Sequence, residues 1–303
     1  MKQGKPDNKK VIIIMGPTAI GKTKVALTLA EQFNTSIISA DSRQCFKELN
    51  IGVAKPSNED LARIPHYFIN SHSIYDEVNA AIFEKLALEA VDKIFEEKDI
   101  AIMVGGTGLY IRAFCEGLDA IPPVDPFLRL EIQHKYASLG LEWLQEETKK
   151  NDPAYYGTAE IQNPQRLMRA LEVKLSTDRS IMTFHSKAIK NRAFDIKKVG
   201  LQLQRNELYK KINERTDRMM GNGLLDEARG LLGSRHLNSL QTVGYPELFD
   251  FIDGKTSLEN AVERIKQHTR LYAKRQMTWF GKDQSIEWIA PTHWDQLKKI
   301  TQS

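Results

Sequence analysis

Eight consecutive residues near the N-terminus have the types and spacing of a phosphate-binding loop. They follow an apolar run at residues 11–15 and are Gly16, Pro17, Thr18, Ala19, Ile20, Gly21, Lys22 and Thr23. The glycines let backbone N–H groups turn towards an anion at the start of a helix, where the helix dipole also favours negative charge. Lys22 adds a positive charge, and the Thr23 hydroxyl can bind magnesium. The pattern predicts a phosphate site without identifying the molecule that carries the phosphate.

Asp41 is a candidate general base. It directly follows a short apolar run at residues 36–40, which predicts a second buried strand. Ligands of parallel α/β sheets gather at the carboxyl ends of the strands, so a carboxylate at this position is expected near the phosphate-binding loop. The alternative is that Asp41 or Ser42 only caps the following turn.

The segments around these residues predict the α/β class, with a P-loop-containing, doubly wound parallel sheet as the core. Apolar runs at residues 11–15, 36–40 and 100–104 predict buried strands, and helices are expected at residues 24–31 and 79–98. Alternation of strands and helices along the chain is typical of parallel sheets.

Two glycines, Gly105 and Gly106, follow the third predicted strand. Many phosphate-cleaving NTPases have an acidic residue for magnesium at this point. Small residues instead let a ligand approach the backbone closely. We therefore expect this segment to form the floor of a substrate channel rather than to supply a second metal ligand.

A helical insertion is expected to interrupt the core. A proline-rich stretch begins at residue 117, and the charged sequence after it predicts helices at residues 126–139, 142–150 and 165–177. The predicted domain boundaries are a disordered lead-in at residues 1–10, an α/β core at 11–117 and 191–290, the helical insertion at 118–190 and a tail at 291–303.

Several basic residues are candidates for binding anions. Arg215 and Arg218, on a helix predicted at residues 206–220, could close over a bound diphosphate. Arg166 and Arg169 share one helical face, which is either simply solvated or contacts a polyanion. A helix predicted at residues 257–280 is the best compositional indication of nucleic-acid binding, because it carries Arg264, Lys266, Arg270, Lys274 and Arg275.

Length and composition limit the class of protein. The 303 residues, 41% hydrophobic and 27% charged, suit one large domain or a domain with an insertion. The net charge of +4 is too small to imply nucleic acid by itself. The two cysteines suggest neither a disulfide framework nor a zinc site. No membrane segment is expected near the start of the chain, because the first apolar run has five residues. We expect a cytoplasmic monomer.

Six motifs, in order along the chain, resemble those of the tRNA dimethylallyltransferases, also called isopentenyl-tRNA transferases. They extend from residue 16 to residue 280 and therefore span nearly the whole sequence. Their order and spacing make the resemblance specific, although no single motif is decisive. The motifs are residues 16–23 (GPTAIGKT), 41–44 (DSRQ), 52–56 (GVAKP), 104–110 (VGGTGLY), 165–172 (QRLMRALE) and 273–280 (AKRQMTWF).

The resemblance implies a specific reaction. A dimethylallyl group is transferred from dimethylallyl pyrophosphate to the exocyclic amine of the adenosine immediately 3′ of the tRNA anticodon, with Mg²⁺, and pyrophosphate is released. The P-loop would then hold a pyrophosphate leaving group rather than ATP. Because the adenine is stacked in the anticodon loop, the enzyme is expected to flip it out.

The resemblance also implies roles for individual residues. Asp41 would be the base, residues 16–23 would cradle the pyrophosphate, Lys22 and Arg215 would neutralise its charge, and Thr23 would lie near Mg²⁺. The positions that would contact the tRNA anticodon stem-loop are Asp41, Ser42, Arg43, Gln44, Thr107, Arg129, Gln165, Arg166, Leu167, Met168 and Arg169.

Two positions depart from the family pattern. Phe46 stands where the family frequently has tyrosine, and Pro246 stands where a basic residue is common.

Two other functions stay open. A small-molecule P-loop kinase is an alternative because of Lys22, Thr23 and the arginines available to a lid. A non-catalytic tRNA-binding module is another, because of the basic helix near the C-terminus. The sequence does not determine which tRNAs or which allylic pyrophosphates are used.

Overall fold

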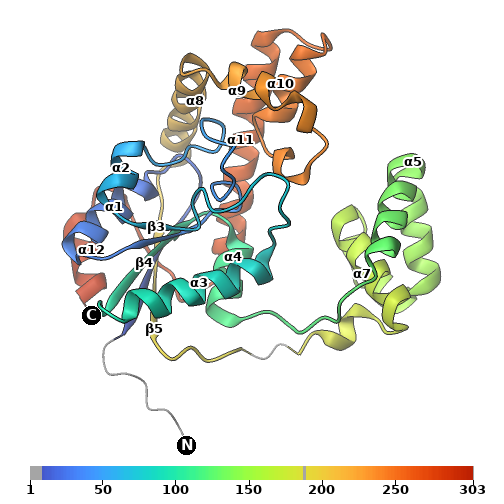
Figure 1. The fold of residues 1–303 in the computed structure, drawn as a ribbon, viewed down its shortest axis with the longest axis horizontal. Coiled ribbons are helices and arrows are strands. Elements are labelled where there is room, and N and C mark those ends of the chain that lie inside the picture. The colour runs from blue at the N-terminus through green and yellow to red at the C-terminus, as the bar shows by residue number, and fades with distance from the viewer. Residues whose placement is uncertain (1–8, 187–188, 303) are drawn as a thin grey trace, which may run out of the picture. The chain divides into compact units, whose positions relative to one another are not determined.

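A computed structural model describes residues 9–186 and 189–302 of the chain (Figure 1). The chain divides into two compact units. One unit, which we call the core unit, consists of Met1–Cys115 and Asn191–Ser303, and the other, the helical unit, consists of Glu116–Lys190.

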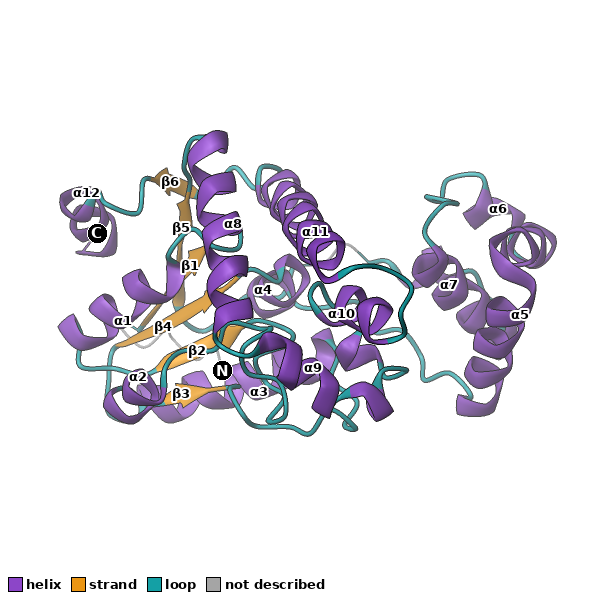
Figure 2. Ribbon diagram, turned by 90° about the horizontal axis from the view of Figure 1, so that it is seen from above, coloured by secondary structure: helices purple, strands orange, loops and turns teal. Residues whose placement is uncertain are grey.

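The core unit is built on a six-stranded sheet in which all paired strands are parallel. The strands lie side by side in Figure 2, in the order β3-β2-β4-β1-β5-β6. Their bounds are β1 (Lys10–Met15), β2 (Ile37–Ala40), β3 (His66–Tyr67), β4 (Ile100–Gly105), β5 (Asp195–Leu201) and β6 (Glu287–Ile289). The predicted doubly wound α/β class is confirmed.

The helices of the core unit connect these strands or follow them. Among the described residues, no helix combines the length and apolar character needed to cross a membrane. The helices are α1 (Lys22–Gln32), α2 (Asn58–Arg63), α3 (Ala80–Phe95), α4 (Gly108–Glu116), α8 (Arg205–Gly221), α9 (Leu224–Gly230), α10 (Tyr245–Ile252), α11 (Leu258–Phe280) and α12 (Trp294–Gln302), with short 3₁₀ turns at η2 (Leu232–Ser234) and η3 (Asn238–Leu240).

Hydrophobic side chains cover both faces of the sheet. Ile12 and Ile14 of β1 belong to a buried cluster with residues of α1, α8, α11 and α12. Ile13 points to the opposite face because side chains alternate along a strand. On that side α3 packs against β2 and β4, and Phe83 of α3 stacks on Tyr110 of α4 with 4.5 Å between ring centroids. The β1 strand, apolar at every position from residue 11 to 15, is therefore central in the sheet.

Both predicted ends of the core differ from the structure. Residues 1–8 of the predicted lead-in lie outside the described residues, but Lys10 begins β1, and Lys9 Nζ donates hydrogen bonds to Phe95 O (2.7 Å) and Lys98 O (2.8 Å). The sequence predicts a tail at residues 291–303, but most of this segment forms the helix α12. Leu297 and Ile300 of α12 are buried in the main hydrophobic cluster, so the helix is part of the core. The sequence does not predict this helix clearly because it spans only nine residues, with Trp294, Leu297 and Ile300 as its apolar positions.

The helical unit contains α5 (Pro126–Asn151), α6 (Pro153–Tyr156), α7 (Pro164–Thr177) and the 3₁₀ turn η1 (Ile181–Phe184). Gly140 has φ of 80° and interrupts α5, at the place where the sequence predicts the end of one helix and the start of another. The α5 and α7 helices pack through Ile132, Leu144, Leu167, Met168 and Leu171. The insertion predicted at residues 118–190 corresponds to this unit of residues 116–190.

We expect Leu297→Ala to lower the free energy of unfolding by about 2–5 kcal/mol, because it leaves a cavity where α12 meets the sheet. Lys298→Ala is the matched control, since the Lys298 side chain is exposed on the same helix, and should change stability by about 0.5 kcal/mol or less. Urea denaturation of both variants measures the difference. Equal stability of the two variants would show that α12 is not part of the core.

Candidate active site

The loops that carry the candidate residues leave the sheet together. Met15 of β1 is level with Gly105 of β4 and Gly200 of β5, and Ala40 of β2 is also level with Gly105. The P-loop, the turn that starts at Asp41 and the loop after β4 therefore begin at one carboxyl edge of the sheet. The parallel register, and not any local contact, brings these segments of sequence together.

The P-loop needs its glycines for two different reasons. Gly16 has φ of 144°, and a Cβ atom at this position would lie 2.7 Å from Leu201 O. Gly21 has φ of 100° and is the N-cap residue of α1, with open space around it. A side chain at residue 16 would push the loop away from β5, whereas one at residue 21 would strain the backbone at the start of α1.

Lys22 points back into the loop that precedes it. Its Nζ atom donates hydrogen bonds to Gly16 O (3.0 Å) and Pro17 O (2.8 Å). Burial lowers the pKa of Lys22 to about 7, the Asp41 carboxylate partly offsets that change, and the positive charge of Arg215 adds to it. The amine is therefore poised to accept a proton when an anion arrives.

Arg215 supplies the second cation of the site. It lies on α8, and burial lowers its pKa to about 10, with Asp41 acting in the opposite direction. Its Nε atom is buried and has no hydrogen-bond partner among the described residues. Arg215 stays protonated at neutral pH, so it offers a positive charge and an unused donor next to the P-loop. The structure thus places Lys22, Asp41 and Arg215 within electrostatic range of one another.

Asp41 combines the two roles that the sequence left open. Its Oδ1 atom accepts hydrogen bonds from the backbone N–H groups of Arg43 (2.9 Å) and Gln44 (3.3 Å), so it caps the turn. No hydrogen bond reaches its Oδ2 atom from the described part of the chain. The cap fixes the orientation of the carboxylate and leaves one oxygen for chemistry.

Two adjoining pockets meet at Asp41. The P-loop pocket, about 260 Å³, is bordered by the loop and by the start of α1, including Thr23. The second pocket, about 290 Å³, extends towards α11 and the segment 241–244 and has apolar side chains on its wall, such as Met219 and Ile265. Both pockets are bordered by Thr18, Asp41, Val53, Ala54 and Arg215. A molecule with an anionic end and an apolar end can therefore lie across this junction.

The predicted tRNA-contacting residues of the core unit have different surroundings. Arg43 borders the second pocket. The Ser42 backbone N–H donates to Thr107 Oγ1 (3.1 Å). Gln44 Nε2 donates to Val53 O (3.2 Å) and to the next carbonyl, that of Ala54 (3.1 Å). The Gln44 amide therefore stabilises residues 53 and 54 of the pocket wall, whereas the Arg43 side chain can contact a ligand in the second pocket.

Two of the predicted tRNA-contacting residues in the helical unit have buried side chains. Leu167 is 0% and Met168 4% exposed, and both pack between α5 and α7. Their contact with an RNA stays a prediction. Gln165 and Arg166 are exposed on the same helix. The prediction named five consecutive residues, but a helix presents only some of them to one side.

The two other arginines of the helical unit share a carboxylate. Arg129 Nε lies 3.4 Å from Glu172 Oε2, and an Arg169 guanidinium nitrogen lies 3.3 Å from the same oxygen. The Glu172 side chain is 7% exposed and therefore orients both guanidinium groups. An RNA phosphate at this place would find two arginines already positioned by one buried acid.

The glycines after β4 accommodate the protein itself. A Cβ atom at Gly105 would lie 2.1 Å from Ala40 O, and one at Gly106 would lie 2.3 Å from Gln276 Nε2. Gly105 does border the P-loop pocket. The close approach that the two glycines permit is made by β2 and α11 and not by a ligand, so the predicted reason for these glycines is wrong although Gly105 lies at the pocket. Sequence alone cannot tell whether a ligand or the chain itself comes close to a glycine.

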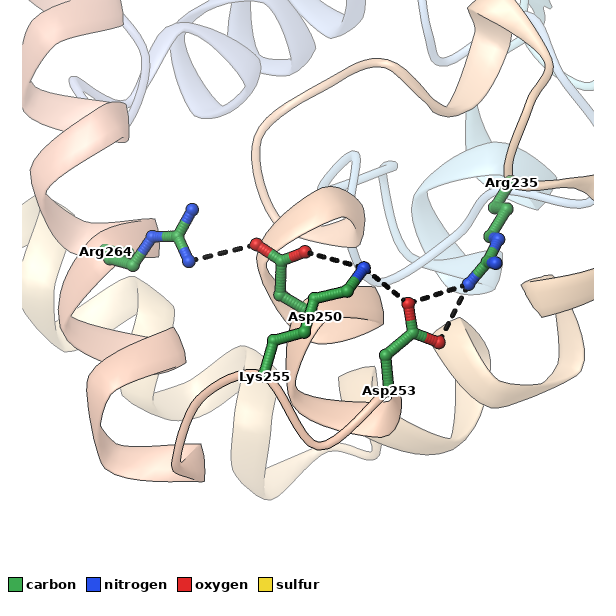
Figure 3. A network of polar contacts seen from close by, with 5 residues as sticks. All are labelled: Arg235, Asp250, Asp253, Lys255 and Arg264. Atoms are coloured by element: carbon green, nitrogen blue, oxygen red, sulfur yellow. Dashed lines mark hydrogen bonds and ion pairs between the residues drawn. The ribbon is translucent and has the colours of Figure 1, made fainter.

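Two of the five basic residues of the α11 stripe are paired with acidic groups, and a third is hydrogen-bonded to an asparagine. Figure 3 shows Arg264 bonded to Asp250 (3.0 Å), within a network that also contains Lys255, Asp253 and Arg235. Lys266 contacts Asp217 (2.8 Å), and Arg270 donates to Asn213 Oδ1 (2.8 Å). Lys274 and Arg275 are exposed, and Arg275 borders the second pocket. Part of the positive charge that suggested nucleic acid therefore holds α11 against its neighbours, and Lys274 and Arg275 are exposed cations of the stripe.

The two departures from the family pattern have structural explanations. Phe46 is 3% exposed and borders neither of the two pockets, while its carbonyl accepts a hydrogen bond from Lys55 Nζ (2.6 Å). Pro246 lies in the first turn of α10, where a missing N–H group costs no helical hydrogen bond.

Glu227 supports the segment beside the two pockets, a role that the sequence did not reveal. Its carboxylate accepts hydrogen bonds from Ile51 N (2.7 Å), Gly52 N (2.9 Å) and Tyr245 Oη (2.8 Å). These bonds hold residues 51 and 52, which directly precede the two residues, Val53 and Ala54, that border both pockets. Glu227 lies on α9, far along the chain from its partners, so no local pattern could have indicated this role.

We expect Lys22 to take up a proton when inorganic pyrophosphate binds. With a pKa of about 7, the amine is mostly neutral at about pH 8.5, and a bound anion raises that pKa by favouring the charged form. Calorimetry in buffers of different ionisation enthalpy should show up to about one more proton taken up by the wild type than by Lys22→Arg, because arginine is already charged. Lys24→Arg, at an exposed position of α1, should match the wild type. Equal uptake by Lys22→Arg would contradict the lowered pKa.

Comparison with known proteins identifies related sequences. Residues 44–283 match the family model described as IPP transferase. The chain is 45% identical over 281 residues to tRNA dimethylallyltransferase 1 of Bacteroides thetaiotaomicron, covering 93% of this chain and 91% of the relative. It is 47% identical over 279 residues to tRNA dimethylallyltransferase of Christiangramia forsetii, covering 92% of each.

Solved structures agree with the sequence relatives. The tRNA isopentenylpyrophosphate transferase of Bacillus halodurans is 34% identical, with a TM-score of 0.69 and coverage of 97% of this chain and 94% of that one. A eukaryotic dimethylallyltransferase acting on tRNA is 25% identical, with a TM-score of 0.77 and coverage of 97% and 77%. With a family model that matches most of its length and relatives this similar, the chain belongs to the IPP transferase family.

Proposed function

We propose that this chain is an enzyme that transfers a dimethylallyl group from dimethylallyl pyrophosphate to the exocyclic amine of the adenosine 3′ of the anticodon in tRNA. The main observation behind the proposal is the junction of two pockets at Asp41, where Lys22 borders the P-loop pocket and Arg215 borders both. The names of the relatives favour this function over a kinase that phosphorylates a small molecule.

The P-loop side would bind the donor by its pyrophosphate. Backbone N–H groups at the start of α1 would donate to the anion, and Lys22 and Arg215 would add two positive charges in a buried setting. Charge builds up on the pyrophosphate as the bond to the allylic carbon breaks. Preorganised donors and cations stabilise that charge most in the transition state, which is where stabilisation accelerates the reaction.

The acceptor amine would enter from the second pocket. The adenine amine is a weak nucleophile because its lone pair is delocalised into the ring, so alignment with the allylic carbon and removal of a proton both help. A nitrogen–carbon bond forms, the carbon–oxygen bond to pyrophosphate breaks with its electron pair, and Asp41 takes the amine proton. The turn that Asp41 caps holds its carboxylate at the junction for that step.

The proposal includes Mg²⁺. Thr23 borders the P-loop pocket at the first turn of α1, and its hydroxyl is a hard oxygen ligand of the kind Mg²⁺ accepts. Within the described residues no group of three or more His, Cys, Asp or Glu side chains could hold a metal. This donor set fits an ion bound through Thr23, pyrophosphate oxygens and water. When bound, Mg²⁺ supplies further charge to the leaving pyrophosphate.

The tRNA would be held by residues of both units. Arg43 borders the pocket for the acceptor, and exposed Gln165 and Arg166 are available on the helical unit. An adenine in an anticodon loop must leave its stack to reach a pocket of about 290 Å³. A monomer in the cytoplasm is part of the proposal, and the two free, buried cysteines are compatible with a reducing compartment.

Incubation with unmodified tRNA, Mg²⁺ and dimethylallyl pyrophosphate, followed by mass analysis of digested nucleosides, tests the function. We expect one adenosine per tRNA to gain a dimethylallyl group in place of a hydrogen. The parallel reaction with ATP and no prenyl donor is the control. If folded protein and competent tRNA yield no prenylated adenosine, the proposed function is wrong.

We expect Asp41→Asn to lower the single-turnover rate of prenyl transfer by about 10²–10⁴-fold, because asparagine can still cap the turn but cannot accept the amine proton. Binding of the tRNA should change little, since the shape and hydrogen bonds of the turn are kept. Asp60→Asn, a carboxylate on the surface helix α2, is the control and should match the wild type. A rate within threefold of the wild type for Asp41→Asn would rule out Asp41 as the base.

A further inference from the structure

Gln276 occupies the space between the P-loop and the loop after β4. It lies on α11 and is 6% exposed. A Cβ atom at Gly106 would lie 2.3 Å from its Nε2 atom, so the loop can pass this close only because residue 106 is a glycine. The packing leaves the amide little freedom to move.

The Gln276 amide bonds to both loops at once. The Thr18 backbone N–H donates to Gln276 Oε1 (2.9 Å), and Gln276 Nε2 donates to Gly106 O (2.9 Å). A backbone N–H can only donate and a carbonyl can only accept, so the orientation of the amide is determined by its partners. A side chain that replaces this amide must supply an acceptor at one end and a donor at the other.

Thr18 differs from the other P-loop residues because its backbone N–H group is bonded to Gln276. Its N–H group is used by Gln276 and is therefore not directed at an anion in the pocket. Thr18 nevertheless borders both pockets. Gln276 thus sets the path of the P-loop at the junction, and the remaining N–H groups of the loop are left to bind the phosphate.

Gly106, the second partner of Gln276, is next in sequence to a residue that contacts the turn of Asp41. Gly106 precedes Thr107, whose Oγ1 atom accepts the hydrogen bond from Ser42 N (3.1 Å), and Ser42 follows Asp41. Two side chains, those of Gln276 and Thr107, therefore connect the P-loop, the loop after β4 and the turn that carries the candidate base. Tyr272 and Arg275, on the same helix as Gln276, border the second pocket.

We propose that Gln276 is a positioning residue that holds the P-loop in the shape that binds pyrophosphate and keeps it in register with the turn of Asp41. The expected effect of Gln276 on catalysis rests on the proposed function. Its effect on the shape of the P-loop does not depend on that function. Gln276 touches neither reacting group and acts through Thr18 and Gly106.

Gln276→Met tests the proposal, because methionine has a similar length and volume and cannot make either hydrogen bond. We expect hydrogen exchange at the Thr18 amide, measured by NMR, to become at least about tenfold faster. The Kd for inorganic pyrophosphate with Mg²⁺ should rise by about tenfold or more. Gln267→Met is the matched control, since Gln267 is exposed on the same helix, and both quantities should equal those of the wild type.

Exchange at Ile13 in the central strand serves as the check on folding, and Gln276→Glu provides a second variant. Glutamate can still accept from Thr18 but places an oxygen against Gly106 O when ionised, so we expect its Kd for pyrophosphate to lie above that of the wild type as well. Unchanged Thr18 exchange and unchanged Kd in folded Gln276→Met would overturn the proposal.

Kinetics separate this inference from the proposed function. If prenyl transfer occurs, we expect Gln276→Met to lower kcat/KM for the prenyl donor by about 10-fold or more while the KM for tRNA stays within about twofold of the wild type. A purely structural role would instead raise both KM values and lower the thermal stability. If the wild type transfers no prenyl group, the proposed function fails, and the exchange and pyrophosphate measurements still decide the role of Gln276.

Discussion

The site depends on buried positive charge that the protein does not fully neutralise. Lys22 and Arg215 both have pKa values lowered by burial, and Asp41 offsets part of that effect for each. Keeping cations in a buried place costs free energy unless counter-charges accompany them. An anionic group in the P-loop pocket would supply the missing charge. The same imbalance that makes the site costly in the free protein therefore favours binding of a diphosphate and stabilises the charge that develops on it.

The irregular segments around that charge take their positions from side chains that bond to backbone. Gln44 holds the carbonyls of residues 53 and 54, Glu227 holds the N–H groups of residues 51 and 52, and Gln276 holds the P-loop and the loop after β4. Loops have no regular hydrogen-bond ladder, so buried polar groups of this kind must be satisfied individually. The three side chains lie far apart in the sequence, and each bonds to a segment that borders at least one of the two pockets.

Strong local patterns made much of the fold predictable. The apolar run at β1 and the glycine-lysine loop after it are dictated by neighbours in sequence, and so is the break in α5 at Gly140. The differences between prediction and structure have a common origin. The motif at residues 165–169 predicts an RNA contact for five consecutive residues, but the packing of α5 on α7 buries the side chains of Leu167 and Met168. The sequence predicts a tail where the structure has α12, because the contribution of this helix to the core depends on a sheet face that sequence does not display.

By itself, the sequence determined the P-loop, the α/β class, the helical insertion and the family of related enzymes, because each depends on residue types at short and regular spacing. The tertiary structure decided which residues meet. Asp41 lies near the P-loop because β1, β2 and β4 end at the same edge of the sheet. Arg215 reaches the site from α8, and Gln276 contacts the P-loop from α11. These contacts join residues more than 200 positions apart in some cases, as for the 258 positions between Thr18 and Gln276. Such pairings follow from the register of the sheet and the packing of helices, which no local pattern encodes.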